Sequence, residues 1–208
     1  MRTLDDCPQV SYGSAMALHA GRLQFGAERG RIALLTARDG LAAQAGHDLT
    51  IEVAHWSADL EIAADLTPAG LTVRADINSL VVREGTGGVK PLTDRDRREI
   101  AVTARRLLRA DRHPVATFTA SEFDPGRDGG GVVRGTLSLA GTERPLRLQV
   151  VKDTDAAYHA TASVRQSDFG VKPYTAFLGV LKVSDAVSIA VDVELPSADH
   201  EAGAGEQP

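Results

Sequence analysis

The stretch VRGTLSLAGTERPLRLQV, residues Val133–Val150, decides how the rest of the chain is interpreted. Apolar residues occupy alternate positions on both sides of the turn Ala140-Gly141-Thr142: Val133, Leu137 and Leu139 before it, and Leu146, Leu148 and Val150 after it. Successive side chains of a strand point to opposite faces. The pattern therefore predicts two antiparallel strands, each with one buried face, joined in a hairpin.

Similar segments recur along most of the chain. Ile32–Ala37 is a short apolar run, and a period of two is found in residues 49–62, 71–77, 116–120, 158–164 and 187–195. Between residues 49 and 62 the apolar positions change from odd to even at Ala54-His55, as happens where a long strand has a bulge or a strong bend. About eight strands with meander spacing predict an antiparallel barrel or sandwich.

One segment has a helical period instead. In Thr93–Asp111, Thr93 is a candidate N-cap and Asp96 follows three residues later, as in a capping box. One apolar stripe follows at helical spacing, made of Ile100, Thr103, Ala104, Leu107 and Leu108. We expect the helix to stop before His113-Pro114. A single amphipathic helix in a strand meander must lie on the sheet or close one end of it.

Motifs of catalysis and of cofactor binding are missing from the sequence. The glycine-rich segment Glu84–Leu92 contains GTGGVK, which departs from a phosphate-binding loop, and we interpret it as a turn that aims the helix. The histidines have no metal-binding spacing, and neither GxSxG nor HExxH occurs. We expect no metal, no cofactor and no enzymatic activity.

Composition narrows the class of protein. The 208 residues suit one domain, and a net charge of −5 argues against nucleic-acid binding. The single cysteine, Cys7, excludes an intramolecular disulfide. The N-terminus has no signal-peptide core and no stretch is long enough for a membrane span, so we expect a cytoplasmic protein. We predict a loosely ordered segment 1–18, a barrel domain 19–195 and a disordered tail 196–208.

Five landmarks in order resemble the YceI-like family of lipocalin-like proteins. They are AGHDL (45–49), the helix, HPVATFTASEF (113–123), the hairpin 133–150 and SDFGV (167–171). The resemblance implies an extended antiparallel β-barrel with one helix beside or across it. It also implies that a polyisoprenoid, isoprenoid quinone or similar long-chain lipid binds in an apolar cavity. Many members are exported, whereas this sequence carries no signal.

We predict ligand contacts from the residues that the barrel would turn inward or place at its mouth. Small residues are expected at many inward positions and would leave space that side chains do not fill: Ala58, Ala75, Ala116, Ala120, Ala160 and Ala162. The aromatic residues are either cavity walls or plain core, and His47 either contacts a head group or is bonded within the protein. The predicted ligand contacts are Trp56, Phe118, Leu137, Phe169, Tyr174, Phe177, His47 and Lys172.

The segment Arg165–Asp185 interrupts the strand pattern, and we predict that it forms a lid over the barrel mouth with Lys172 and Lys182 at the rim. The family's RSDFG reads QSDFG here, which moves the arginine to Arg165 on the opposite face and leaves Gln166 toward the ligand. An anionic pyrophosphate head and an uncharged quinone-like head both remain open. For Asp168 we expect a structural role in the turn.

Two alternatives of different kinds stay open beside lipid carriage. The interior can be filled by its own side chains, as in a structural or interaction module. A small hydrolase or isomerase on the same scaffold would need an acid–base pair in the cavity. Separately, barrels of this kind often expose an apolar face beside the helix, which is compatible with a homodimer.

Overall fold

Our computed structural model describes residues 19–40, 43–154, 156–176 and 180–195. The predicted N-terminal segment 1–18, the tail 196–208 and Phe177 of the lid lie outside these residues. Within the described residues the structure has twelve strands, one α-helix and three 3-10 helices. The strands are β1 Gly21–Gly26, β2 Gly30–Asp39, β3 His47–Val53, β4 Trp56–Ile62, β5 Pro68–Asp76, β6 Leu80–Gly87, β7 Val115–Pro125, β8 Gly131–Leu139, β9 Thr142–Lys152, β10 Ala157–Arg165, β11 Thr175–Ala176 and β12 Leu181–Glu194. The helices are α1 Asp94–Leu107, η1 Ala43–Ala45, η2 Ile77–Ser79 and η3 Gln166–Phe169.

All strand pairs are antiparallel, and the sheet curls around a central space in the order β1-β4-β5-β7-β8-β9-β10-β12-β2-β3-β6. The hairpin predicted at 133–150 is β8–β9, with Val133 opposite Leu148. Its two-residue turn has φ of 51° at Ala140 and 82° at Gly141. Positive φ at both turn positions matches the right-handed twist of the flanking strands.

The change of period at Ala54-His55 marks a corner between two strands. β3 pairs with β2 and β6, whereas β4 pairs with β1 and β5. The adjoining chain bends at the same place, since Ala54 N–H donates to Ser79 O at 3.2 Å and Asp76 N–H donates to His55 O at 3.0 Å. β1 and β2 are therefore the two halves of one long strand that bends in the middle, and so are β3 and β4, and β5 and β6. Counted in this way, the described residues contain eight long strands, as the sequence predicted.

The two edge strands and the short β11 were not anticipated from the sequence. β6 includes residues 84–87, which the sequence analysis assigned to a glycine-rich loop, so the loop begins only at Gly88. The reason is packing: a side chain at Gly85 would collide with the end of Leu92, so glycine lets the loop fold back over the strand. The glycines in this stretch therefore allow other side chains to approach the backbone closely, in addition to allowing the chain to turn.

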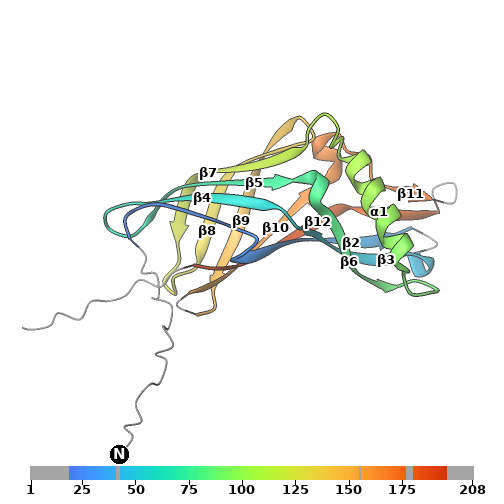
Figure 1. Ribbon diagram of the computed structural model, residues 1–208, viewed down its shortest axis with the longest axis horizontal. Coiled ribbons are helices and arrows are strands. Elements are labelled where there is room, and N and C mark those ends of the chain that lie inside the picture. Colours follow the sequence, from blue (N-terminus) through green and yellow to red (C-terminus); the bar gives the residue numbers. More distant parts are fainter. Residues whose placement is uncertain (1–18, 41–42, 155, 177–179, 196–208) are drawn as a thin grey trace, which may run out of the picture.

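The helix forms where the capping box predicted it. Thr93 Oγ1 accepts a hydrogen bond from Asp96 N–H at 3.2 Å, and Asp96 Oδ2 accepts one from Thr93 N–H at 2.9 Å. The helix ends at Leu107, before His113-Pro114. Figure 1 shows α1 lying beside β6, at the end of the barrel that holds β2, β3 and β11. Arg97 Nη1 donates to Arg83 O at 2.9 Å, which satisfies a carbonyl of this edge strand.

Two buried clusters hold the sheet in its curled shape. One lies at the corner and includes Trp56, whose ring meets Phe25 edge-on at 6.0 Å between centroids. The other joins Phe118 and Leu137 to Phe169 and further apolar residues near η3. Among the helices that the structure describes, none has the length and apolar content needed to cross a membrane.

Candidate functional site

A cavity of about 1430 Å³ runs inside the curled sheet. It is larger than the roughly 300–1,000 Å³ typical of sites for small ligands. β12 lines it along its whole length, from Leu181 at one end to residues beyond Val191 at the other. At about 3.3 Å per residue, β12 spans roughly 45 Å. The space is therefore long as well as large.

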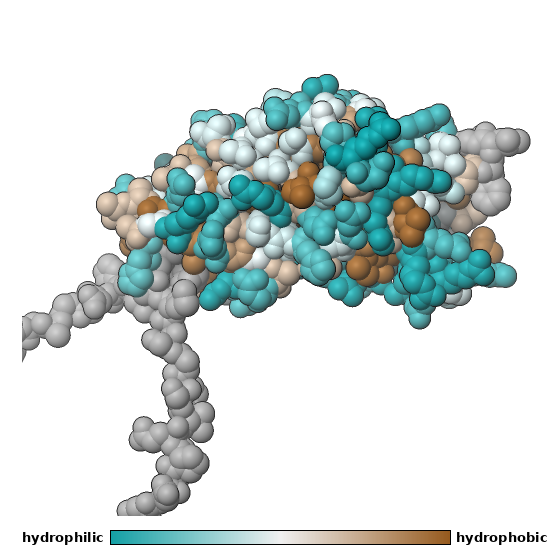
Figure 2. All heavy atoms as spheres, turned by 45° about the horizontal axis from the view of Figure 1, so that its top comes forward, coloured by the Kyte–Doolittle hydropathy of each residue, from teal (hydrophilic) through white to brown (hydrophobic). Residues whose placement is uncertain are grey.

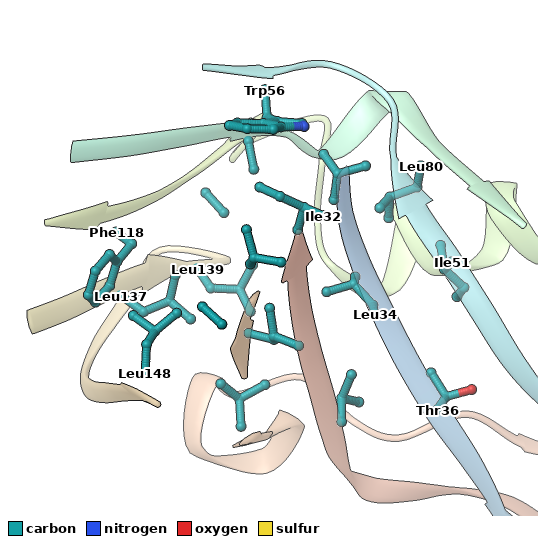
Figure 3. A pocket seen from close by; sticks show the side chains of 18 of the residues that line it. Ile32, Leu34, Thr36, Ile51, Trp56, Leu80, Phe118, Leu137, Leu139 and Leu148 are labelled. Atoms are coloured by element: carbon teal, nitrogen blue, oxygen red, sulfur yellow. The ribbon is translucent and has the colours of Figure 1, made fainter. Parts of the chain in front are cut away.

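The cavity wall is almost entirely aliphatic and aromatic. Figure 3 shows side chains from opposite sides of the barrel surrounding one space, among them Ile32, Leu34, Ile51, Trp56, Leu80, Phe118, Leu137, Leu139 and Leu148. Alanines occupy wall positions on four different strands: Ala58, Ala75, Ala116 and Ala160. Their small side chains leave the volume that the sequence predicted. Ala120 and Ala162, which were also expected to face the cavity, lie outside its lining and pack against the second buried cluster. Trp56 Nε1 and Thr36 Oγ1 are the buried polar side-chain atoms of this wall that have no partner among the described residues.

Helix α1 supplies one side of the wall. The five residues of its predicted stripe all line the cavity: Ile100, Thr103, Ala104, Leu107 and Leu108. Only Ala101 is fully buried within the helix. The apolar face of α1 therefore borders the cavity, in addition to packing on other side chains.

At one end the cavity opens between polar side chains. We call this opening the polar mouth and define it by Arg38, His47, Lys90 and Lys182, which all line the cavity. His47 Nε2 donates to Lys90 O at 2.8 Å. Arg38 Nη1 donates to Gly46 O at 3.0 Å, and its Nε lies 3.6 Å from Asp48 Oδ2.

Two glycines make the polar mouth possible. Gly87 and Gly88 have φ of 80° and 72°, a conformation that other residues rarely adopt. A side chain at Gly87 would collide with the guanidinium of Arg38, and one at Gly88 with the imidazole of His47. The loop after β6 can therefore lie directly on these two side chains and carry the Lys90 carbonyl to His47.

The opposite end of the cavity is lined mainly by apolar residues and glycines. We call it the far mouth and define it by Leu66, Phe123, Tyr158 and Leu195. Leu66 is 44% exposed to solvent while also lining the cavity. A ligand with one polar end and one long apolar end matches the two different openings.

A model of the YceI-like domain matches residues 33–195. The chain belongs to the YceI-like domain family. Two solved structures share the YceI-like fold at low sequence identity. BcnA of Burkholderia cenocepacia is 15% identical, with a TM-score of 0.56 over 79% of this chain and 94% of that one. The YceI protein of Campylobacter jejuni is 18% identical, with a TM-score of 0.51 over 69% and 82%. Among curated protein sequences there is no match.

The YceI-like barrel brings five of the eight predicted contact residues to its cavity: Trp56, Phe118, Leu137, Tyr174 and His47. Trp56 and Phe118 line the cavity and also belong to the buried clusters. Each is therefore both cavity wall and core. His47 has the second of its two predicted roles, since it is bonded within the protein to Lys90 O; it also lines the mouth, and its contact with a head group stays a prediction.

Two predicted residues lie elsewhere. Phe169 is 2% exposed and packs in the second cluster, because the turn of η3 directs it into the protein rather than into the cavity. Lys172 is exposed and outside the cavity lining, whereas the second predicted rim lysine, Lys182, is part of that lining. Phe177 is outside the described residues.

The QSDFG segment places its side chains as the change of arginine position indicated. Gln166 lines the cavity and donates from Nε2 to Ser184 O at 2.9 Å, while Arg165 is exposed. Asp168, expected to accept bonds from the turn, is exposed instead. Asp185 takes that role by accepting from Ser167 N–H at 2.8 Å and from its hydroxyl. These bonds lower the pKa of Asp185, the hydroxyl bond being the larger cause.

Sequence reasoning missed Arg38 and Lys90 at the polar mouth. A signal for Arg38 was present, because the even positions Ile32, Leu34 and Thr36 of β2 line the cavity and Arg38 continues that series. Lys90 sits on an irregular loop, where no period predicts the direction of a side chain.

Several titratable side chains line the cavity, among them His47, Asp96 and Glu99. In the part of the chain that the structure describes, no group of three or more His, Cys, Asp or Glu side chains is placed to hold a metal ion. The carboxylate of Asp96 at the cavity edge has a lowered pKa because the Thr93 hydroxyl donates to it. Its role is therefore to cap the helix.

Proposed function

We propose that this protein binds a long-chain amphiphile, such as a polyisoprenoid or an isoprenoid quinone, and stores or carries it without chemical change. The observation that supports this most directly is the apolar cavity of about 1430 Å³ that extends along the barrel. The ligand class follows the family to which the chain belongs. A basic opening at one end and a mainly apolar opening at the other are consistent with a ligand that has one polar head.

Burial of the tail would supply most of the binding free energy. Each CH₂ removed from water contributes about 0.8 kcal/mol, so each one strengthens binding by about fourfold. Ten such groups would contribute about 8 kcal/mol, which exceeds what one charged contact supplies. The head group would then determine selectivity and not the bulk of the affinity.

The polar mouth is where we place the head group. Arg38 is already bonded to Gly46 O and lies near Asp48. Within the described residues no salt bridge engages Lys90 or Lys182, so these two cations remain available to an anionic head. A quinone-like carbonyl would instead accept a hydrogen bond from a neutral donor, such as the Thr36 hydroxyl or the Trp56 indole N–H, which have no partner among the described residues. At the polar mouth itself, the two unpaired lysines favour a phosphate-bearing head.

The single tryptophan provides the experiment. Trp56 is the only one in the chain and lines the cavity, so its fluorescence reports directly on occupancy. Titration with isoprenoid alcohols of increasing length, and with their phosphates, measures the effect of tail and head separately. We expect affinity to rise with tail length until the tail spans the barrel, and the phosphate to bind more tightly than the alcohol of equal length.

Two results would overturn the proposal. Equal affinity for short and long tails would mean that the tail does not enter the barrel. No change in Trp56 fluorescence with any lipid would favour the alternative of a barrel that acts as an interaction module. The cytoplasmic location, the homodimer and the absence of catalysis stay predictions.

A further inference from the structure

Several apolar side chains around the polar mouth are exposed to solvent. Val89 is 79% exposed at the tip of the β6–α1 loop, next to Lys90. Across the opening Tyr174 is 44% and Val180 is 42% exposed. Figure 2 shows separate brown residues among teal ones at this end of the molecule. Single exposed apolar residues are common on protein surfaces, so what distinguishes these is their position around the cavity opening.

These side chains lie on one continuous rim. Val180 O is directly beside Gly40, and the Leu181 side chain lies against Gly46. On the other side of the opening the His47 imidazole lies against Gly88, one residue before Val89. Tyr174 O accepts from Val183 N–H at 3.0 Å, which ties it to the start of β12. The valines and the tyrosine thus flank the opening itself.

The lysines of the chain collect at the same end. Of its four lysines, Lys90 and Lys182 line the polar mouth, and Lys172 is exposed on the segment that leads to β11. Only Lys152 lies elsewhere, at the end of β9. Several acids near the mouth are engaged within the protein. Asp48 lies near Arg38, Asp96 caps the helix, and Glu99 pairs with Arg95 at 2.8 Å.

We propose that the polar mouth docks on an anionic lipid bilayer, with Val89 and Val180 entering the interface and the lysines contacting acidic head groups. Lysine beside exposed apolar residues suits a membrane interface, because its stem is apolar and its charge reaches the head groups. The chain as a whole is anionic, so this end would also orient the protein on approach. Docking places the cavity opening against the bilayer from which an amphiphile enters. The inference rests on the proposed lipid binding.

Association with vesicles tests the docking surface. The full chain is sedimented with vesicles of phosphatidylcholine, with and without phosphatidylglycerol. We expect association only with the anionic vesicles, and we expect it to weaken as salt increases. Each lysine contributes about fivefold, so Lys90→Glu together with Lys182→Glu should reduce association by at least about 25-fold. Val89→Ser should also reduce it.

Matched controls separate a surface effect from a general one. Lys152→Glu makes half of the charge change of the double variant, at the end of β9, and is compared with the single variants Lys90→Glu and Lys182→Glu. Val102→Ser removes a side chain that is 60% exposed on the outer face of α1. Both controls should associate like the unmodified protein. If Lys152→Glu weakens association as much as either single variant, or if neutral vesicles bind equally well, the docking proposal is wrong.

A second readout distinguishes this proposal from the proposed function. Lipid dispersed in detergent is offered to the unmodified protein, and Trp56 fluorescence reports on uptake without any bilayer. Uptake from detergent together with no vesicle association would overturn the docking surface and leave lipid binding in place. Vesicle association with no Trp56 response to any lipid would support docking and overturn lipid binding.

Discussion

A phenylalanine at position 160 should obstruct the cavity without disturbing the fold. Ala160 is the middle residue of an inward-facing set, since its partners in register, Val150 on β9 and Val191 on β12, both line the cavity. Val191 lies four residues before Leu195 at the far mouth, so about 13 Å of the cavity lies beyond this position. A ring here would exclude the last part of a long tail.

The size of the effect follows from the length excluded. If only four CH₂ groups lose their burial, binding weakens by about 3 kcal/mol, or roughly 200-fold. An isoprenoid too short to reach Ala160 should bind Ala160→Phe as it binds the unmodified protein. Because the ring enters space that other side chains do not fill, we expect the free energy of unfolding to change by less than about 1 kcal/mol.

The assay is the Trp56 titration with a short and a long isoprenoid, beside denaturant unfolding. The matched control is Thr161→Phe, which places the same ring one residue further along β10, where the side chain is exposed on the outer face. Equal affinities of the two variants for the long lipid would refute the reasoning. A loss of about 1–3 kcal/mol of stability in Ala160→Phe, with binding intact, would instead show overpacking of a filled interior.

Three further predictions concern the framework around the cavity. The Arg83 guanidinium, bonded to Glu52 at 2.7 and 3.0 Å, lowers the pKa of that carboxyl below its usual value. Glu52→Gln should therefore cost up to about 1 kcal/mol of unfolding free energy near neutral pH. That difference should disappear as the pH falls through the folded-state pKa, because only the charged carboxylate gains from the pair, and denaturant unfolding across pH measures it. Thr93→Ala removes the helix N-cap and should cost about 1 kcal/mol, with faster amide exchange in the first turn of α1. Gly88→Ala meets both a positive φ and the His47 imidazole, so it should displace the loop and speed lipid release in a stopped-flow exchange experiment, whereas unchanged release would contradict the role given to the loop.

The strands and the helix could be predicted because their signals are local. Alternation at β8 and β9 and the capping box at Thr93 each depend on neighbours within a few residues. The odd-to-even change at Ala54-His55 located the corner, but the sequence could not show that the halves join different strands, since pairing is a long-range property. The second half of β6, residues 84–87, was mistaken for a loop in part because of its glycines, of which Gly85 makes room for Leu92.

The candidate site was predictable on regular strands and less so on irregular segments. Trp56, Phe118 and Leu137 lie on strands, where the period of two fixes the inward direction. Phe169 and Lys172 lie at or after a short 3-10 helix, where one residue of rotation decides between core, cavity and solvent. A phenylalanine ring is buried whether it packs in the core or lines the cavity. The residue type alone therefore does not show whether the ring faces a ligand.

The most direct test of lipid binding is organic extraction of the full-length protein purified from its native host, followed by mass spectrometry and determination of the amount per chain. The account predicts one long-chain amphiphile at close to one molecule per chain, with a head group that the polar mouth can contact. Extracts without lipid, from protein that also takes up no isoprenoid in the Trp56 titration, would contradict it.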